Sequence, residues 1–522
     1  MANIVSMPAH PTSVAMHRPL LAVFAVLLGP FMVGFHSRMF GIGLVDLKGA
    51  FGLSYDEGAW LSTLATAPQI ILAPAVAWFA AAYGIRRVIV GPALIYAFIS
   101  AIIPFARDYH FLIGLHIVHG ALLGLFIPAT LMIIFQTLPS KWWMSAIGFY
   151  AFRAAFTTNS GPGLIDFYVQ HLGWQLLYWQ DVVLAPLMAL LILKGTSSRE
   201  PNRELIRSAD WGGMILFGSG LAMLFVAVDQ GNRLDWFENG IVVSTLLGGF
   251  ALMIAFFLNE VLVAHPWASI SAISARNVIL LLVVSLFYLM SASSNTALVP
   301  NFLINVMQLR PEQVGSTLVI WACAPLIVMT PVAVWAMHRI DGRLVLFAGL
   351  CCFAGAALIG TGLTSDWSGE NFRTMLVLQG TGHILTFLPV IAVAIAHGDP
   401  KRAVAVAAYI QVIRVLGTQT AQALMTTFIR KGEQFHSYAV GLNLQRGSEI
   451  SADAISAIAR AVASSGQSLA ASRATAVVAQ HVQKQANTLA YIDAFWLTFY
   501  CAMAGLILLA FVTKAPKGPL SA

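Results

Sequence analysis

Residues 210–237 read DWGGMILFGSGLAMLFVAVDQGNRLDWF, and an apolar run from residue 211 to residue 229 fills most of this stretch. A helix needs about 20 predominantly apolar residues to cross the hydrocarbon core of a bilayer. The run therefore predicts a transmembrane helix with an Asp-Trp pair beyond each end. Similar runs recur along most of the chain, so the predicted fold class is an all-α polytopic membrane protein.

The composition of the whole chain indicates the same class. Its 522 residues are 58% hydrophobic and only 10% charged, with a mean hydropathy of +0.79. Soluble domains carry about 25% charged residues, which excludes a soluble protein of this length. The first apolar run begins near Pro19 without a small-residue cleavage site, so we expect a retained span. The four cysteines have neither a disulfide pattern nor the spacing of a metal site.

About fourteen apolar runs are long enough to be spans. They cover residues 19–44, 58–82, 88–106, 111–137, 144–168, 176–195, 211–229, 239–262, 277–299, 314–337, 344–363, 374–397, 403–429 and 490–513. This arrangement predicts loops that alternate between the two sides of the membrane.

The basic residues of those loops predict the orientation. One side collects Arg18, Arg86, Arg87, Lys141, Lys194, Arg199, Arg203, Arg207, Arg276, Arg339, Arg343, Lys401, Arg402, Lys514 and Lys517. Short loops on the other side hold only Lys48, Arg107, Arg233, Arg310 and Arg373. Cytoplasmic loops are enriched in Lys and Arg, so we predict a bacterial inner-membrane protein with both termini in the cytoplasm. The net charge of +7 follows from this topology and does not indicate nucleic-acid binding.

Two motifs resemble the fourteen-span drug/proton antiporters of the major facilitator superfamily (EmrB/QacA type). Residues 210–237 are similar to the family's D-W-x-G opening of span seven and the D-W before span eight. Residues 406–424, VAAYIQVIRVLGTQTAQAL, are similar to its span thirteen, with Arg414 and Gly417. The resemblance covers nearly the whole chain. It implies two six-helix bundles around a central site, two helices inserted between them, and transport by alternating access.

The resemblance also implies the domain organisation. The expected parts are a cytoplasmic tail (1–18), an N-terminal bundle (19–195), an inserted helix pair with flanking loops (196–265), five helices of the C-terminal bundle (266–429), an outer helical loop (430–489), and the last helix with a cytoplasmic tail (490–522). The outer loop is rich in Ala, Ser and Gln, which favours helices with little core of their own. It is either a spacer or a docking surface for a periplasmic adaptor that leads to an outer-membrane channel.

Several residues match conformational motifs of the family. Gly84, Arg86 and Arg87 occupy the motif after span two, and Asp341 occupies the equivalent turn of the second half. An acid that is usual in the first motif is missing. In span five, the motif residues are Gly161 and Pro162. A Gly-Pro pair bends a helix and lets backbones approach closely.

Span one departs from the family in the stretch FMVGFHSRMFGIGL, residues 31–44. His36 takes the position of the family's Asp, and Arg38 lies two residues later. Residues two apart diverge by about 200° on a helix. Arg38 shares its face with Gly34 and Gly41, small residues that mark helix contacts, so we expect Arg38 to face protein. Snorkelling of either side chain to the membrane surface is the alternative.

Five spans carry polar residues at helical spacing, which places them on shared faces. These stripes are Tyr150, Arg153, Thr157 and Ser160; Gln411, Arg414 and Thr418; Gln379, His383 and Thr386; Ser62, Thr66 and Gln69; and Tyr288, Ser291 and Asn295. Unpaired polar groups are costly against lipid, so a shared watery cavity is expected; bonding to the helix backbone or between helices is the alternative. The predicted substrate-binding residues are Arg38, Arg153, Tyr150, Thr157, Gln379, His383, Gln411 and Arg414.

Basic side chains dominate the predicted spans, and no carboxylate lies near the middle of any of them. Such a cavity attracts anions. We therefore expect proton-coupled efflux of a small organic anion or a neutral aromatic compound. Proton-coupled uptake of an organic acid and a non-transporting membrane sensor are the alternatives. The chain has no H-E-x-x-H, P-loop or G-x-S-x-G motif, so neither an enzyme nor a cofactor is expected.

Proton coupling needs a titrating group, and histidine titrates closest to neutral pH. His36 and the His116/His119 pair of span four are the predicted proton carriers. Asp166 and Asp181, toward the outer ends of spans five and six, are the alternative.

Overall fold

The computed structural model describes residues 19–41, 43–198, 200–264, 266–268, 275–397, 409–410, 412–446, 448–462, 467–516 and 520. The regular elements of this part of the chain are helices, without a strand among them. Eleven described helical segments are long and apolar enough to cross a membrane. The prediction of an all-α, multi-pass membrane protein is confirmed.

The first bundle is built from the N-terminal third of the chain. It contains α1 (Pro19–Gly41), α3 (Tyr55–Leu72), α4 (Val76–Tyr83), α5 (Ile85–Ile102), α6 (Tyr109–Leu123), α7 (Phe126–Thr137), α8 (Trp143–Phe167) and α9 (Leu176–Gly195). The short helices α2 (Leu44–Phe51) and α10 (Arg203–Arg207) lie in connections. The inserted pair follows as α11 (Trp211–Gly231) and α12 (Gly240–Leu262).

The second bundle contains several interrupted helices. Its elements are α13 (Arg276–Ser293), α14 (Val299–Asn305), α15 (Pro311–Leu318), α16 (Ala324–Arg339), α17 (Gly342–Gly360), α18 (Arg373–His397), α20 (Thr418–Arg446) and α22 (Gln467–Leu509). Three π-helical turns, η7 (Ser294–Leu298), η8 (Val319–Cys323) and η11 (Ile413–Gly417), directly precede α14, α16 and α20. Such turns are frequent at functional sites.

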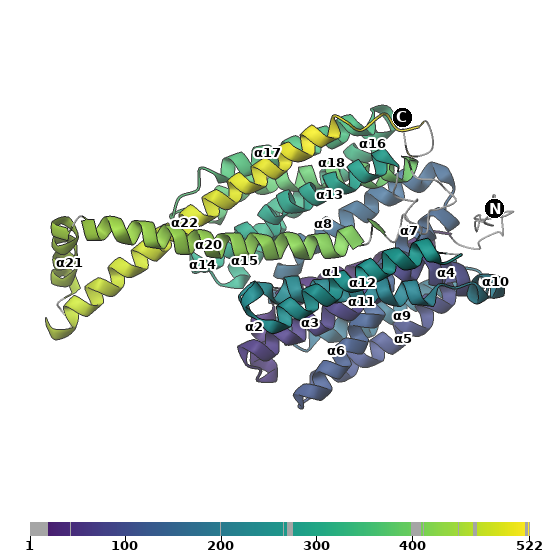
Figure 1. The fold of residues 1–522 in the computed structure, drawn as a ribbon, viewed down its shortest axis with the longest axis horizontal. Coiled ribbons are helices and arrows are strands. Elements are labelled where there is room, and N and C mark those ends of the chain that lie inside the picture. Colours follow the sequence, from purple (N-terminus) through teal and green to yellow (C-terminus); the bar gives the residue numbers. More distant parts are fainter. Residues whose placement is uncertain are drawn as a thin grey trace.

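Helices α20 and α22 extend beyond both bundles and are joined at their far end by α21 (Ser448–Val462) (Figure 1). We call the end of the molecule that carries α21 the extension side. Helix α22 has 43 residues, which at 1.5 Å per residue makes it about 65 Å long. That is about twice the thickness of the hydrocarbon core, so a large part of α22 projects from the membrane.

The two bundles pack against each other on the side opposite α21. One buried apolar cluster joins Ile147 and Tyr150 of α8 to Met337 of α16 and Leu388 of α18. A Cβ atom on Gly148 would lie only 2.4 Å from Cγ2 of Val334, so the helix backbones approach closely there. Close packing of this kind leaves no space for water, and it closes the centre of the molecule toward that side.

The inserted pair lies along the first bundle and reaches the second. Helix α11 packs on α12, α3 and α20. Gly218 of α11 fits directly over the backbone of α3, where an added Cβ would lie 2.6 Å from the carbonyl oxygen of Ile71. This close approach holds α11 against the bundle core, so its inner face belongs to the interior of the protein.

Candidate transport site

A polar cavity of about 440 Å³ lies between the two bundles. Helices α1, α3, α6, α7, α8 and α11 line it on one side, and α13, η7, α14, α17, α18, η11 and α20 line the other. The π-helical turns η7 and η11 therefore contribute to its wall. Volumes of this size are typical of small-molecule sites.

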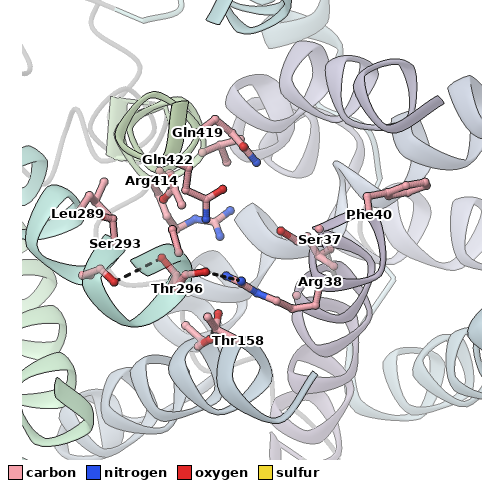
Figure 2. Close-up of a pocket in the computed structure, with 18 of the residues that line it drawn as sticks. Ser37, Arg38, Phe40, Thr158, Leu289, Ser293, Thr296, Arg414, Gln419 and Gln422 are labelled. Carbon is pink, nitrogen blue, oxygen red and sulfur yellow. Dashed lines mark hydrogen bonds between the residues drawn. The ribbon is translucent and has the colours of Figure 1, made fainter. Parts of the chain in front are cut away.

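Arginines reach into this cavity from both bundles. Figure 2 shows Arg38 of α1 and Arg414 of η11 extending toward the same space from opposite walls. Nη1 of Arg38 donates to the carbonyl oxygen of Thr296 in η7 at 3.4 Å, a contact that crosses between the bundles. Arg38 thus faces protein, as the glycines on its helix face predict.

Gly161 makes room for the Arg38 side chain. A Cβ on Gly161 would lie 2.8 Å from Cγ of Arg38, closer than a real contact allows. The adjacent Pro162 lies inside α8, and Pro162 and Gly163 lie against Gly315 of α15. The Gly-Pro motif therefore serves close packing of α8 against both bundles.

Arg153 lies deeper, with 7% of its surface exposed. Its Nη1 donates to the carbonyl oxygen of Pro30 at 2.8 Å, and its guanidinium lies 5.0 Å from the centre of the Tyr150 ring. The other two guanidinium nitrogens, Nε and Nη2, have no hydrogen-bond partner among the residues that the structure describes. Buried donors without partners are costly, and an anion in the cavity would satisfy them.

Most of the predicted polar stripes line the cavity. The lining includes Ser62, Thr66 and Gln69 of α3, Tyr288 and Asn295 of the α13–η7 segment, Gln379 and His383 of α18, and Arg414 and Thr418 of the η11–α20 segment. Asn295 Nδ2 donates to Oδ1 of Asn159 in α8 at 2.8 Å, a second contact between the bundles. The predicted residue Gln411 lies outside the described residues.

Two of the predicted substrate-binding residues, Tyr150 and Thr157, do not line the cavity. Tyr150 is buried and stacks on Phe387. The Thr157 hydroxyl donates to the carbonyl oxygen of Arg153, one turn back, at 2.9 Å. Its methyl group packs where a Cβ on Gly34 would come within 2.8 Å. Thr157 therefore faces α1 and Tyr150 faces α18, while Thr158 and Asn159 line the cavity.

The three predicted histidines meet in a buried cluster beside the cavity. His36 Nε2 donates to Oδ2 of Asp181 at 2.6 Å, and the His36 and His119 ring centres are 4.8 Å apart. The Tyr96 hydroxyl also donates to Asp181 Oδ2, at 2.8 Å. His116 bonds to the Tyr178 hydroxyl at 2.9 Å through Nε2. His36 and His119 also line the cavity, so they connect the cluster to it.

Asp181, rather than Asp166, belongs to this cluster. Asp181 is fully buried, whereas Asp166 accepts a hydrogen bond from Gln170 on the surface of α8 at 2.5 Å and does not line the cavity. Asp166 is the next-to-last residue of α8, apart from the histidines, and its role as an alternative proton carrier stays a prediction.

The cluster also resembles a set of metal ligands. Donor atoms of His36, His119 and Asp181 all lie within 4.8 Å of one another. The 2.6 Å contact between His36 and Asp181 is nevertheless shorter than the spacing of about 3.3 Å between two ligands of tetrahedral zinc. The arrangement is that of a hydrogen-bonded pair.

The conformational motif residues lie on the side opposite α21. Gly84 joins α4 to α5 with a positive φ of 82°, which favours glycine. Arg86 donates to the Leu193 carbonyl oxygen of α9, while Arg87 is exposed. Asp341 caps α17 through the Arg343 amide and pairs with the Arg343 guanidinium at 2.8 Å. These hydrogen bonds hold the pKa of the Asp341 carboxyl below its ordinary value.

Sequence reasoning missed Asp229, the one carboxylate among the described residues that line the cavity. It comes from α11 of the inserted pair and accepts a hydrogen bond from the Thr63 hydroxyl at 2.5 Å. The one sequence feature that pointed to Asp229 is its position as the last residue of the apolar run 211–229. That position indicates a charged group at a helix end, but not that the helix reaches the central cavity.

A family model for the Major Facilitator Superfamily matches residues 26–419. The chain belongs to this superfamily. A multidrug export protein EmrB of Haemophilus influenzae is 21% identical over 513 residues, covering 96% of each chain. The fatty acid resistance protein FarB of Neisseria gonorrhoeae is 20% identical over 78% of this chain and 80% of its own. These relatives confirm the resemblance to the EmrB/QacA-type antiporters.

Solved structures agree on the fold. The proton:xylose symporter XylE matches with a TM-score of 0.57 at 11% identity, covering 95% of this chain and 96% of its own. The fold is that of the major facilitator transporters, with two bundles around the cavity. The protein is a membrane transporter and not an enzyme.

Proposed function

We propose that this protein exports small organic anions or neutral aromatic compounds by proton-coupled alternating access. The observation that carries the proposal is the placement of Arg38, Arg153 and Arg414 around one cavity beside a buried His–Asp pair. The relatives named for multidrug export and fatty acid resistance support this direction and class.

The charge of the cavity favours anions. Three arginines and a single carboxylate, Asp229, line it in the described part of the chain. Charge interactions strengthen as the dielectric falls, so a partly buried cavity of this kind repels cations. The ring faces of Tyr288, Phe353 and Phe387 also line it, and they provide an apolar surface for an aromatic group.

The His36–Asp181 pair is suited to carry the proton. Both side chains are almost fully buried, and a buried charge is stable only when it is paired. A proton added to the pair makes His36 cationic against an anionic Asp181, and its removal leaves one net negative charge. The packing around the pair therefore depends on its protonation, which is what coupling to a conformational change requires.

The conformation of the two bundles is consistent with one state of an alternating-access cycle. The apolar cluster shared by α8, α16 and α18 closes the side opposite α21. In the orientation predicted by the basic loops, that side is cytoplasmic and the extension side is periplasmic. The cavity is then closed toward the cytoplasm. In an export cycle, this is the state in which substrate taken from the cytoplasm can leave toward the periplasm.

The extension of α20, α21 and α22 supports docking of a periplasmic adaptor. It projects beyond both bundles (Figure 1) and presents exposed aromatic side chains such as Phe435 and Tyr438. An adaptor bound there would connect the inner-membrane transporter to an outer-membrane channel. Deleting residues 440–480 should then abolish co-purification of an adaptor while leaving flux in liposomes intact.

The direct test is a flux panel in proteoliposomes under an imposed pH gradient. The panel compares aromatic carboxylates, lipophilic cations and neutral aromatics, with Arg38→Gln as the site variant. We expect gradient-driven movement of carboxylates against the proton, reduced in the variant. A clear preference for cations would overturn the proposal.

Directionality separates export from the alternative of proton-coupled uptake. In vesicles of known orientation, export requires that the anion move opposite to the proton. Movement of both in the same direction would establish the uptake permease. Binding without any flux would instead establish a sensor.

A further inference from the structure

Asp229 has an environment unlike that of the other charged groups of the cavity. It is carried by the inserted helix pair, not by either bundle. Its carboxylate accepts from the Thr63 hydroxyl of α3 at 2.5 Å. None of the Lys or Arg side chains in the described residues forms an ion pair with it. Arg233 acts on Asp229 electrostatically without forming an ion pair with it, so Asp229 can gain a proton without breaking an ion pair.

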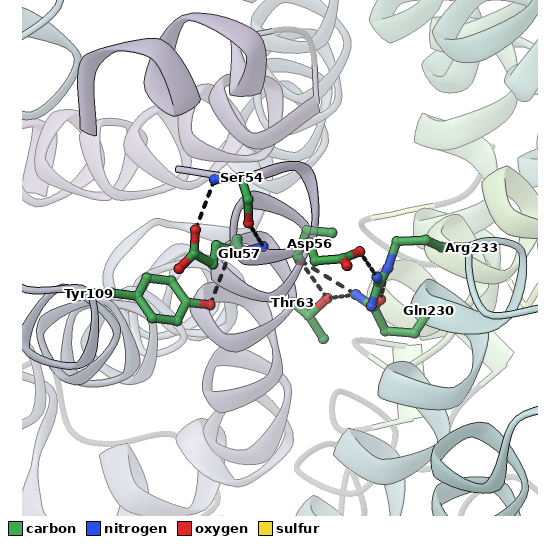
Figure 3. A network of polar contacts seen from close by, with 8 residues as sticks. Ser54, Asp56, Glu57, Thr63, Tyr109, Gln230 and Arg233 are labelled. Carbon is green, nitrogen blue, oxygen red and sulfur yellow. Dashed lines mark hydrogen bonds and ion pairs between the residues drawn. The ribbon is translucent and has the colours of Figure 1, made fainter. Parts of the chain in front are cut away.

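The neighbouring charges are already paired with each other. In Figure 3, Arg233, just after α11, reaches Asp56 of α3, and its Nε donates to Oε1 of Gln230 at 2.6 Å. Asp235 of the same connection pairs with Arg430 of α20 at 2.8 Å.

The other elements around Asp229 contribute few titrating groups. Glu260 is the carboxylate of α12. It lies near the C-terminal end of α12, whereas Asp229 lies near the C-terminal end of the antiparallel helix α11, and Glu260 accepts a hydrogen bond from the Ala268 amide. The groups that share the cavity with Asp229 are Arg38, Arg153, Arg414, His36, His119, His383 and Tyr288.

The contact between Thr63 and Asp229 can persist in both protonation states. A hydroxyl has one proton to donate and two lone pairs to accept with. Thr63 Oγ1 lies 2.5 Å from Asp229 Oδ2 and 3.1 Å from the Ala59 carbonyl oxygen, and it accepts from Gln230 Nε2. When Asp229 is ionised, Thr63 donates to it. When Asp229 holds a proton, Asp229 donates to Thr63 and Thr63 donates to Ala59.

We propose that Asp229 sets the charge selectivity of the cavity according to its protonation. Ionised Asp229 opposes one arginine charge and disfavours an anionic substrate. Protonated Asp229 leaves an arginine-dominated cavity that favours an organic monoanion. This inference rests on the anion preference of the proposed function and adds a selectivity role that is separate from coupling. At Asp229, proton and anion bind with positive cooperativity and proton and cation compete, while the proton exchanged for substrate is the one carried by the His36–Asp181 pair.

The test compares two naphthalene compounds of opposite charge. Naphthalene-1-carboxylate and naphthalene-1-methylammonium each keep their charge between about pH 5 and pH 8, because a carboxyl titrates below and an amine above that range. Their dissociation constants are measured on the full chain in nanodiscs across this range. The variants are Asp229→Asn and, as a matched control, Glu238→Gln, which removes an exposed carboxylate nine residues further on.

We expect the wild-type protein and Glu238→Gln to bind the carboxylate more tightly as the pH falls, by roughly tenfold for one nearby charge. Asp229→Asn should bind it tightly at every pH and bind the ammonium compound roughly tenfold more weakly. A pH dependence that survives in Asp229→Asn would overturn the inference, as would unchanged affinities for both compounds. Elution volume in gel filtration and thermal unfolding identify a variant that misfolds. If Asp229→Asn misfolds, Asp229→Glu replaces it, and we expect Asp229→Glu to retain the pH dependence of carboxylate binding.

The flux measurements test the proposed transport, and the binding measurements test the role of Asp229, so each proposal can be refuted without the other. Absence of flux with intact, Asp229-dependent binding would refute the proposed transport and leave the selectivity role standing. Flux of carboxylates with binding that ignores Asp229 would refute the selectivity role alone.

Discussion

Arg38 is a proposed substrate-binding residue, because it enters the cavity from α1 and its hydrogen bond to the opposite bundle, among the described residues, is a 3.4 Å contact to the Thr296 carbonyl oxygen. Replacing it with Gln should raise the KM for an aromatic carboxylate by roughly tenfold to a hundredfold. That range corresponds to the loss of one charge-assisted hydrogen bond, about 1.5–3 kcal/mol. Concentration-dependent flux in proteoliposomes measures this change.

The matched variants for Arg38 are Arg38→Lys and Ser37→Ala. Lysine keeps the charge without the planar fork of donors, so it should fall between wild type and Gln. Ser37 also lines the cavity and its loss should change KM little. An unchanged KM in Arg38→Gln would exclude the guanidinium from the substrate site.

His36 and Asp181 should behave as one unit in coupling. Because they share a buried 2.6 Å hydrogen bond, His36→Gln, Asp181→Asn and the double variant should each lose at least tenfold of pH-driven accumulation, without additivity. Exchange of labelled for unlabelled substrate, which needs no proton gradient, should continue. Comparing the two assays separates coupling from binding.

An exposed histidine supplies the control for this pair. His110 lies at the start of α6, outside the cluster, and His110→Gln should retain full accumulation. Full pH-driven accumulation by His36→Gln would remove the pair from the proton path.

The sequence predicted many of these residues because helical spacing is a geometric property. Positions three, four and seven apart share a face, which placed Gln379 with His383 on the cavity wall. The same rule grouped Tyr150 and Thr157 with Arg153. It could not show that Thr157 packs on α1 and Tyr150 on α18, because the neighbour of a helix face depends on tertiary packing.

At the scale of single helices, the contact between α8 and α1 depends on Gly161. Gly161→Ala should displace the Arg38 side chain, since the added Cβ would approach its Cγ to 2.8 Å. We expect a severalfold loss of carboxylate transport with normal expression. Gly114→Ala is the control, because nothing lies within 4 Å of a Cβ there, and equal activity of the two variants would contradict this account.

The start of α17 gives a prediction about stability and pH. The Arg343 hydrogen bonds lower the pKa of Asp341, so its contribution to the free energy of unfolding is present above the ordinary carboxyl pKa. It is lost as the pH falls through the lowered value, below about pH 4. Asp341→Ala should cost about 1 kcal/mol at neutral pH, measured by thermal unfolding in detergent.

Asparagine separates the cap of α17 from its ion pair. Asn caps a helix about as well as Asp, and partly exposed ion pairs contribute little. Asp341→Asn should therefore retain most of the stability at neutral pH. Equal losses in both variants would assign the effect to the ion pair.

The order of elements was more predictable than their contacts. Long apolar runs predict spans from length alone, and the fold class follows from them. Asp229 shows the limit, because its run predicts a helix correctly and carries no information on which helices that helix touches.

For the whole molecule, the packed side opposite α21 must open during each cycle. In a cysteine-free background, Gly148→Cys with Val334→Cys should form a disulfide, since a Cβ on Gly148 would lie 3.9 Å from Cβ of Val334, within disulfide range. Oxidation should stop transport and a reductant should restore it. Each single variant is the control, and transport that continues in the oxidised pair would show that this side stays closed throughout.

The long continuous helix α22 also makes the extension a lever. About half of its roughly 65 Å lies beyond the hydrocarbon core. A bundle rotation of about 15°, the size of a rigid-body domain movement, would swing the tip of such a rod by about 8 Å. A protein bound to α21 would therefore be displaced once per transport cycle. The tip of the extension would move in solution whenever the central cavity changes its conformation.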